Sequence, residues 1–116
     1  MARRRRVAPY VPQVDNHDAA LEDALAKSIN LAVPWYLMAS YGYYIKDVSI
    51  LSDAAYDRLC VLLRDRWDEI THHHKDRIDR ASLNAGSGFG LREEQYPLIA
   101  RDAAHSLIKQ LKHGNE

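Results

Sequence analysis

The sequence has little of what a covalently bridged or membrane-spanning protein needs. Its single cysteine, Cys60, cannot form an internal disulfide, so nothing indicates a secreted disulfide scaffold. No apolar run approaches the roughly 18 residues that a membrane-spanning helix requires. Four arginines near the N-terminus are followed by Pro9 and Pro12 instead of an apolar run, so a signal peptide is not expected. We therefore expect a cytoplasmic protein that does not bind a membrane.

The sequence also has a formal net charge of zero, because 16 basic residues balance 16 acidic ones. Four of the basic residues stand together in the first six positions, and these are Arg3, Arg4, Arg5 and Arg6. Twelve basic residues therefore face sixteen acidic ones in the remainder, a net charge of about −4, which is not a uniformly basic nucleic-acid-binding body. Residues 1–14 are expected to be a basic, flexible arm. The arm either binds nucleic acid or another acidic surface by counterion release, or only keeps the chain soluble.

No segment of useful length shows strand periodicity, whereas apolar residues recur at helical spacing. We expect an all-α fold for residues 15–116, a small helical domain of about four helices built around a helical hairpin. A first helix begins near Asn16 or Asp18, either of which can cap it. Pro34 ends or kinks this helix and suits the first turn of the next, which extends to about residue 45.

Ser52 is a good N-cap for a third helix, which the apolar spacing extends to about residue 74. Residues 84–90 contain three glycines and are predicted to form a loop. No strand precedes these glycines and no Lys-Ser pair follows them, so a plain turn is favoured over a phosphate cradle. Pro97 begins a last helix that Gly114 ends. Cys60 has no motif partner and is interpreted as a packing residue.

Residues 41–59, YGYYIKDVSILSDAAYDRL, are the most informative stretch. Asp53, Tyr56 and Asp57 stand at i, i+3 and i+4, so one helix face presents all three. The carboxylates can accept hydrogen bonds from ribose hydroxyls or a carboxamide, and a tyrosine ring can stack on a flat, cationic ring. The alternative is an ordinary amphipathic helix with tyrosines in the core and aspartates that favour its N-terminus.

The same stretch resembles the N-terminal Ia segment of NAD-dependent DNA ligases, whose pattern is roughly YxY(H/Y)xxDxPxxxDxEYDxL. The matching residues are Tyr41, Tyr43, Tyr44, Asp47, Asp53, Tyr56, Asp57 and Leu59. Ser49 replaces the usual proline and Ala55 the usual glutamate. The resemblance implies a site for the nicotinamide mononucleotide (NMN) half of NAD, with ligand contacts at Tyr43, Tyr44, Asp53, Tyr56 and Asp57. Tyr44 is often histidine in the family.

A ligase also needs an adenylation lysine in a KxDG motif, zinc-finger segments and helix-hairpin-helix segments, and the sequence contains none of these. We therefore expect a protein that is neither a ligase nor another enzyme. Small phage proteins described as ligase-related resemble this chain more widely, over residues 41–100. That resemblance implies a phage or prophage accessory protein that works in the host cytoplasm.

Three consecutive histidines, His72–His74, form a second cluster. If the third helix continues, Glu69, His72, His73 and Asp76 share a face that could hold zinc or manganese. The histidines could instead favour a helix C-terminus without any metal. A third alternative is that a histidine, Lys75 or Arg77 contacts a ligand phosphate. No metal or other cofactor is expected to be required.

Three functions remain open from the sequence. The first is non-catalytic binding of NAD, NMN or a related ADP-ribose-type nucleotide, by which a phage could counter host defence. The second is a small helical inhibitor or adaptor that binds a host protein and uses the ligase-like helices only as a scaffold. The third is cleavage of NAD by Asp53, Asp57 and the histidines, for which no acid–base pair of certain spacing is present. An apolar patch formed by Trp35, Tyr36, Tyr41 and Trp67 would also allow a homodimer.

Overall fold

The computed structural model describes residues 14–80, 83 and 91–111, and it confirms the all-α fold class. Its α-helices are α1 (Asp18–Lys27), α2 (Ala32–Ser40), α3 (Asp53–Asp65) and α5 (Leu98–Lys109). Shorter helical turns are η1 (Ile29–Leu31), η2 (Tyr41–Ile45), η3 (Trp67–Glu69), η4 (Lys75–Arg77) and η5 (Glu93–Gln95). In the described ranges the only β-type pairing is an isolated bridge between Val14 and Leu111. None of the described helices has the length and apolarity that crossing a membrane requires.

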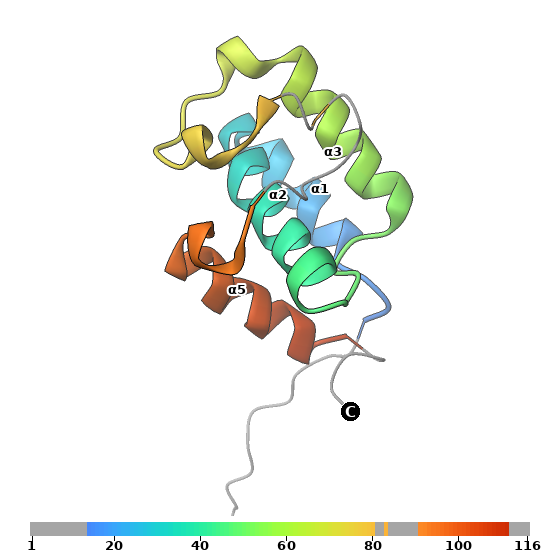
Figure 1. The fold of residues 1–116 in the computed structure, drawn as a ribbon. Helices are drawn as coiled ribbons and strands as arrows, with labels where there is room; N and C mark the ends of the chain where they lie inside the picture. Colours follow the sequence, from blue (N-terminus) through green and yellow to red (C-terminus); the bar gives the residue numbers. More distant parts are fainter. Residues whose placement is uncertain (1–13, 81–82, 84–90, 112–116) are drawn as a thin grey trace, which may run out of the picture.

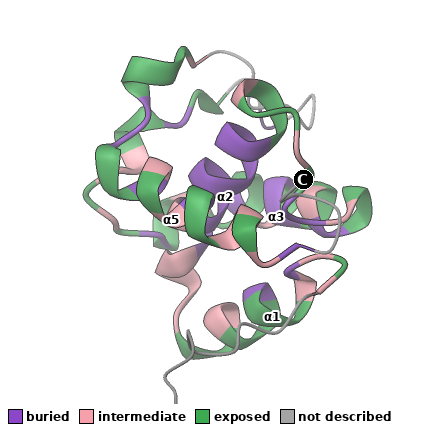
Figure 2. Ribbon diagram, turned by 90° about the horizontal axis from the view of Figure 1, so that it is seen from below, coloured by how far each residue is buried: buried purple, intermediate pink, exposed green. Residues whose placement is uncertain are grey.

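The central element is α2, which α1, α3 and α5 surround (Figure 1). Every residue of α2 except Pro34 is buried, as Figure 2 shows by its colour. The sequence explains this position, because no charged residue occurs between Lys27 and Lys46. A helix that is apolar on all sides is stable only when other elements cover all of its faces. Pro34 is the third residue of α2 and therefore lies in its first turn, as predicted.

The predicted helical hairpin is formed by α2 and η2 on one side and α3 on the other. Ser52 caps α3, with its Oγ accepting a hydrogen bond from the Ala55 amide at 3.1 Å. The rings of Tyr36 on α2 and Tyr56 on α3 stack with centroids 5.8 Å apart and planes 17° apart. The two helices are therefore fixed to each other through aromatic side chains that also border the candidate site described below.

The predicted ends of three helices are wrong. The first helix does not continue to Pro34, because α1 ends at Lys27 and Ser28 is extended. The third helix does not reach residue 74, because α3 ends at Asp65 and Arg66 leaves the helical conformation. The following segment is held elsewhere: the Thr71 amide donates to Asn30 Oδ1 at 2.8 Å, which ties it to η1. In a continuing helix the Thr71 amide would donate to a carbonyl four residues earlier, so it could not form this long-range hydrogen bond with Asn30. The last helix begins after Pro97 as predicted, but it ends at Lys109, and Gly114 lies outside the described residues.

The four aromatic residues that were expected to form an exposed apolar patch are largely buried. Trp35, Tyr36 and Tyr41 are all buried, and Trp67 is half-buried. They are buried because α2 is the central helix, a position that its sequence neighbours alone do not reveal. The prediction that these four residues form an exposed surface for a homodimer is therefore wrong, although the oligomeric state is a separate question.

Candidate functional site

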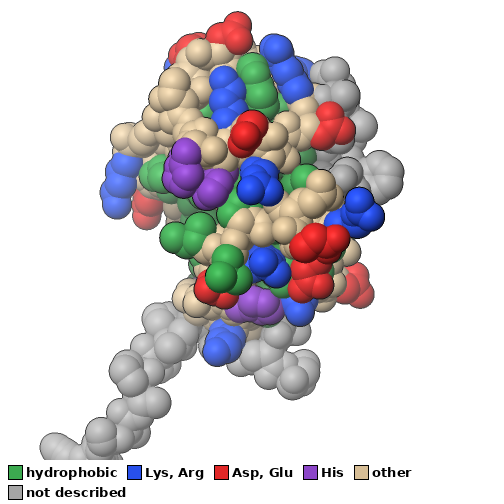
Figure 3. Space-filling model, turned by 60° about the vertical axis from the view of Figure 1, so that its left-hand side comes forward, with side chains coloured by type: hydrophobic (Ala, Val, Ile, Leu, Met, Phe, Trp, Pro, Cys, Tyr) green, Lys and Arg blue, Asp and Glu red, His purple; other side chains and the backbone are tan. Residues whose placement is uncertain are grey.

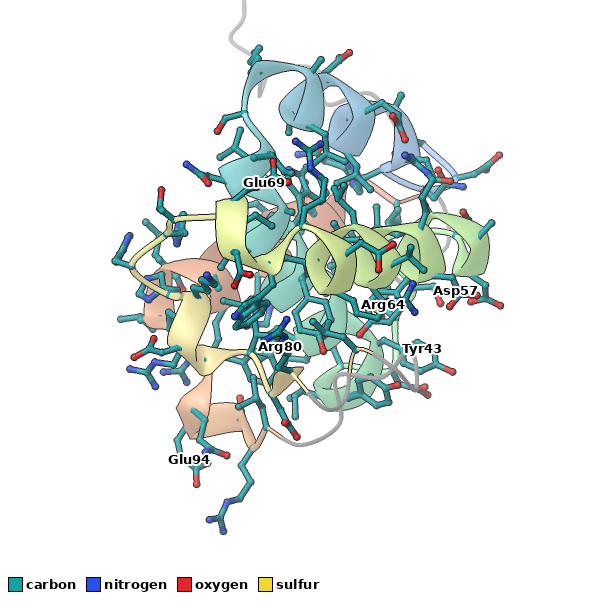
Figure 4. The ribbon with its side chains drawn as sticks, turned by 90° about the horizontal axis from the view of Figure 1, so that it is seen from above. Tyr43, Asp57, Arg64, Glu69, Arg80 and Glu94 are labelled. Atoms are coloured by element: carbon teal, nitrogen blue, oxygen red, sulfur yellow. The ribbon has the colours of Figure 1, made fainter. Side chains whose placement is uncertain are left out.

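The structure brings Tyr43, Tyr44, Asp53, Tyr56 and Asp57 together around one cavity of about 280 Å³. The remaining lining residues are Ala39, Ser49, Ile50 and Leu51. In Figure 4 the labelled side chains of Tyr43 and Asp57 lie at the same end of the molecule, one from η2 and the other from α3. All five residues proposed from the ligase-like register thus share a solvent-accessible hollow at the closed end of the hairpin.

The first turn of α3 supplies Asp53, Tyr56 and Asp57, and a carboxylate from α1 holds that turn in place. Asp18 accepts hydrogen bonds from the Ser52 amide at 2.9 Å and from the Ser52 hydroxyl at 2.6 Å. Ser52 Oγ therefore serves both helices, as donor to Asp18 and as acceptor for α3. Because these contacts fix where α3 begins, they also fix the direction in which its first turn presents its side chains to the cavity.

The opposite wall carries Tyr43 and Tyr44, and its shape depends on Gly42. A Cβ atom at Gly42 would lie 2.7 Å from Ile50 Cδ1 and 3.1 Å from the Val48 carbonyl oxygen. The Val48 amide donates to the Gly42 carbonyl at 2.8 Å, so the chain folds back closely over this position. Asp47 closes the turn with a φ of 59°, a left-handed conformation that aspartate tolerates better than most residues. Gly42 and Asp47, both inside the ligase-like stretch, thus shape the backbone here.

Tyr56 is half-buried and is held from two sides. Its hydroxyl is hydrogen-bonded to Ser40 Oγ at 2.8 Å, and Tyr36 stacks on its ring. Burial raises the pKa of both Tyr36 and Tyr56 above the ordinary range, so both phenols stay neutral at physiological pH. With one face against Tyr36, Tyr56 can offer a ligand only its other face or its edge.

Tyr43 and Tyr44 are the more accessible rings, with 51% and 38% of their surfaces exposed. They meet edge to face, with centroids 4.8 Å apart and planes at 88°. Asp53 and Asp57 are exposed as well. Within the part of the chain that the structure describes, no lysine, arginine or histidine lines the cavity. On the face of the molecule drawn in Figure 3, by contrast, side chains of both charges are interspersed.

Several contributors to the site were not predicted from the sequence. Ser49, which stands where the ligase pattern has proline, adds a residue to the lining, and Ser40 anchors Tyr56. Asp18 orients α3 from 34 residues away. The sequence marks Ser49 as a departure from the ligase-like pattern, but nothing in the pattern assigns it to the lining. Nothing local in the sequence marks Asp18 or Ser40, because their partners are reached only through the packing of different helices.

The predicted histidine face does not form. Because α3 ends at Asp65, Glu69 lies on η3 and pairs with Arg66 at 2.6 Å, while Asp76 lies on η4. His72 and His73 stack on each other with centroids 4.5 Å apart in the turn between η3 and η4. Over residues 14–80, 83 and 91–111, no group of three or more histidine, cysteine, aspartate or glutamate side chains could hold a metal ion. The zinc or manganese alternative is therefore wrong for these residues.

The residues that could have contacted a ligand phosphate also lie away from the cavity. Neither His72, His73 nor Asp76 lines it. Lys75 Nζ lies over the Trp67 ring, 4.7 Å from its centroid, and Arg77 donates to the Gln95 carbonyl at 3.0 Å. These two cations are engaged within the protein.

Two segments with sequence-based predictions lie outside the described residues. One is the glycine-rich loop at 84–90. The other is the basic arm with its predicted contacts to nucleic acid or an acidic surface, namely Arg3, Arg4, Arg5 and Arg6. The predicted role of the four arginines therefore stays a prediction.

We expect the histidine turn, His72–His74, to make the stability of the fold sensitive to acid. Burial, followed by the nearby His73, lowers the pKa of His72 and of His74. The neutral forms are thus favoured in the folded state, so this contribution to stability is fully present above the unfolded pKa of about 6.5 and is lost as the pH falls from there through the lower folded pKa. The His74 amide also donates to His72 Nδ1 at 3.1 Å, a bond that needs neutral His72.

We expect the double variant His72→Gln/His74→Gln to lose less melting temperature than the wild type between pH 7 and pH 5. Glutamine keeps polar atoms in the turn but does not titrate in this range. Thermal denaturation followed by circular dichroism at both pH values measures the difference. An equal or larger loss in the variant would contradict the role given to these two rings.

Cys60 is buried on α3, and burial raises its thiol pKa to about 11. A thiol that stays protonated and inaccessible is a poor nucleophile. The packing role expected from the sequence agrees with this environment.

No protein-family model, curated protein or solved structure matches this chain.

Proposed function

We propose that this protein is a non-catalytic binding module for a nicotinamide nucleotide, either NMN, NAD or a related ADP-ribose-type molecule. The observation that carries the proposal is the cavity, in which Tyr43, Tyr44, Asp53, Tyr56 and Asp57 meet. Their i, i+3, i+4 spacing on α3 and the fold-back at η2 put phenol rings and carboxylates within reach of one small polar ligand. The ligase-like register of residues 41–59 supports the nicotinamide nucleotide as that ligand.

The size of the cavity favours the mononucleotide half of NAD. Pockets for drug-sized ligands occupy roughly 300–1,000 Å³, and this one, at about 280 Å³, lies at the lower limit. A whole dinucleotide would extend beyond it. We therefore place the nicotinamide and its ribose in the cavity, and the adenylate of NAD outside it.

Binding without turnover is supported by the chemistry of the lining. Tyr56 stays neutral, so it is not a general base at physiological pH. The histidines of the NAD-cleavage hypothesis do not line the cavity with Asp53 and Asp57. A phage protein with such a site could sequester a nicotinamide-containing signal of the host, which is how we propose it would counter host defence.

A thermal-shift titration of the full chain with NMN, NAD and ADP-ribose tests this proposal. Ligand at about 100 times its dissociation constant should stabilise the folded state by roughly 2.7 kcal/mol, which raises the melting temperature by several degrees. Asp57→Asn keeps the shape of the side chain, removes one carboxylate from the cavity and should abolish most of the shift. If none of the three compounds shifts the wild type, the proposed function is wrong.

One observation favours the second candidate function, an adaptor that binds a host protein. Leu98 and Ile99 begin α5 with 64% and 71% of their surfaces exposed, which is unusual for two adjacent large apolar residues. A Leu98→Ser/Ile99→Ser variant should keep the nucleotide-dependent thermal shift, because neither residue lines the cavity. If no nucleotide binds and this variant loses a phenotype that the wild type shows in host cells, the adaptor is the better explanation.

A further inference from the structure

The charged side chains among the described residues that line the cavity are all acidic. Asp53 and Asp57 contribute two carboxylates, and the described lining contains no cationic side chain to balance them. Among the described residues, a ligand group that enters the cavity therefore meets negative charge and phenol rings, and a phosphate there would be repelled by both carboxylates.

Two backbone amides at the N-terminus of α3 are already bonded within the protein, which makes this end a poorer phosphate site. Helix N-termini commonly bind phosphates through free backbone amides. Here the Ser52 amide donates to Asp18 Oδ1 and the Ala55 amide donates to Ser52 Oγ. Asp18 thus already occupies the position that an anion would take. Asp53, in the first turn, adds a second negative charge at the same end of the helix.

The aromatic walls favour positive charge. The faces of phenol rings carry partial negative charge and attract organic cations within about 6 Å of the ring centre. Tyr43 and Tyr44 are exposed and mutually perpendicular, so they offer ring surfaces in two directions. Tyr56 adds a third ring, which Ser40 holds in place. Three phenols with two carboxylates form the kind of surroundings that stabilise a flat, fixed cation.

We propose, on the premise of the proposed function, that the cavity selects its ligand by the positive charge of the nicotinamide ring. Oxidised nicotinamide nucleotides carry this charge on the ring nitrogen, and the reduced forms do not. The cavity therefore distinguishes the oxidised from the reduced ligand. The phosphate contributes nothing to affinity, because it remains in water at the mouth of the cavity. The ligand class is a flat aromatic cation that carries a ribose.

Isothermal titration calorimetry of the full chain with four ligands tests the proposal. They are nicotinamide riboside, reduced nicotinamide riboside, NMN and reduced NMN. The oxidised member of each pair should bind at least about tenfold more tightly than the reduced one, a difference of about 1.4 kcal/mol. Nicotinamide riboside should bind as tightly as NMN or more tightly. Asp53→Asn and Asp57→Asn should each reduce the ratio of oxidised to reduced affinity, whereas Asp65→Asn at the far end of α3 should preserve it.

Each outcome decides between the two proposals. If oxidised and reduced ligands bind equally, charge selection is wrong and the nucleotide-binding function stands. If NMN binds more than about tenfold more tightly than the riboside, the phosphate is held and the inference is likewise overturned. If none of the four compounds binds, the inference is wrong, and if NAD and ADP-ribose also fail to bind, the proposed function is wrong too.

Discussion

Replacing Asp18 with alanine is expected to destabilise the fold by about 2–3 kcal/mol, which lowers the melting temperature by roughly 10 °C. The carboxylate accepts hydrogen bonds from both the amide and the hydroxyl of Ser52, and hydrogen bonds to charged groups are among the stronger ones. Its loss leaves two donors unpaired at the start of α3. Chemical denaturation followed by tryptophan fluorescence and circular dichroism measures the change in the free energy of unfolding.

The variant also separates a positioning role from a ligand-contacting role. Asp18 does not line the cavity, yet it holds the turn that presents Asp53 and Asp57. Asp18→Ala should therefore weaken ligand binding at a temperature where the variant remains folded. Asp23→Ala removes the same charge from an exposed position on the same helix and serves as the control. If both variants lose equal stability, Asp18 does not organise the start of α3.

A double-mutant cycle with Ser52→Ala sharpens this test. Both residues belong to one hydrogen-bonded network, so their effects should not add. The double variant is expected to be destabilised by less than the sum of the single ones. Additive effects would mean that the two side chains act independently, contrary to the geometry.

The features that the sequence predicts correctly depend on short spacings. Ser52 as a helix cap and Pro34 in a first turn follow from the preferences of single residues. Asp53, Tyr56 and Asp57 fall on one face because of helical periodicity, and the hairpin brings Tyr43 and Tyr44 to the same cavity. These relations span at most 14 residues, from Tyr43 to Asp57. Local physical chemistry is therefore sufficient to establish them.

The features that the sequence does not predict depend on contacts between distant segments. The apolar stripe of α3 continues through Trp67 to Ile70, so periodicity alone extends the helix too far. The helix ends at Asp65 instead, and the segment that follows is tied to Asn30, 41 residues away, whose side chain accepts a hydrogen bond from the Thr71 amide. The metal-site hypothesis failed for the same reason, because it assumed a helix that continues beyond Asp65. The burial of Tyr36 and Tyr41 likewise follows from the central place of α2.

Replacing Gly42 with alanine is expected to destabilise the fold and to distort the cavity. The new methyl group would lie 2.7 Å from Ile50 Cδ1 and 3.0 Å from its Cγ1, and Ile50 is fully buried. Overpacking of this kind costs about 1–3 kcal/mol, while alanine regains at most about 1 kcal/mol through its better helix propensity. The net loss should be about 1–2 kcal/mol. Because Ile50 also lines the cavity, its displacement should weaken ligand binding too.

Ile50→Val provides the matched rescue, since it removes the Cδ1 atom that the new methyl group meets most closely. Alone it should cost about 0.5–1.5 kcal/mol for the lost methyl group. Combined with Gly42→Ala it should cost less than the sum, by at least about 0.5 kcal/mol, because each change makes room for the other. Urea denaturation of the four proteins gives this coupling energy, and calorimetry gives the recovery of ligand affinity. A Gly42→Ala variant as stable as the wild type, or strictly additive effects, would show that the close approach at Gly42 does not shape this wall.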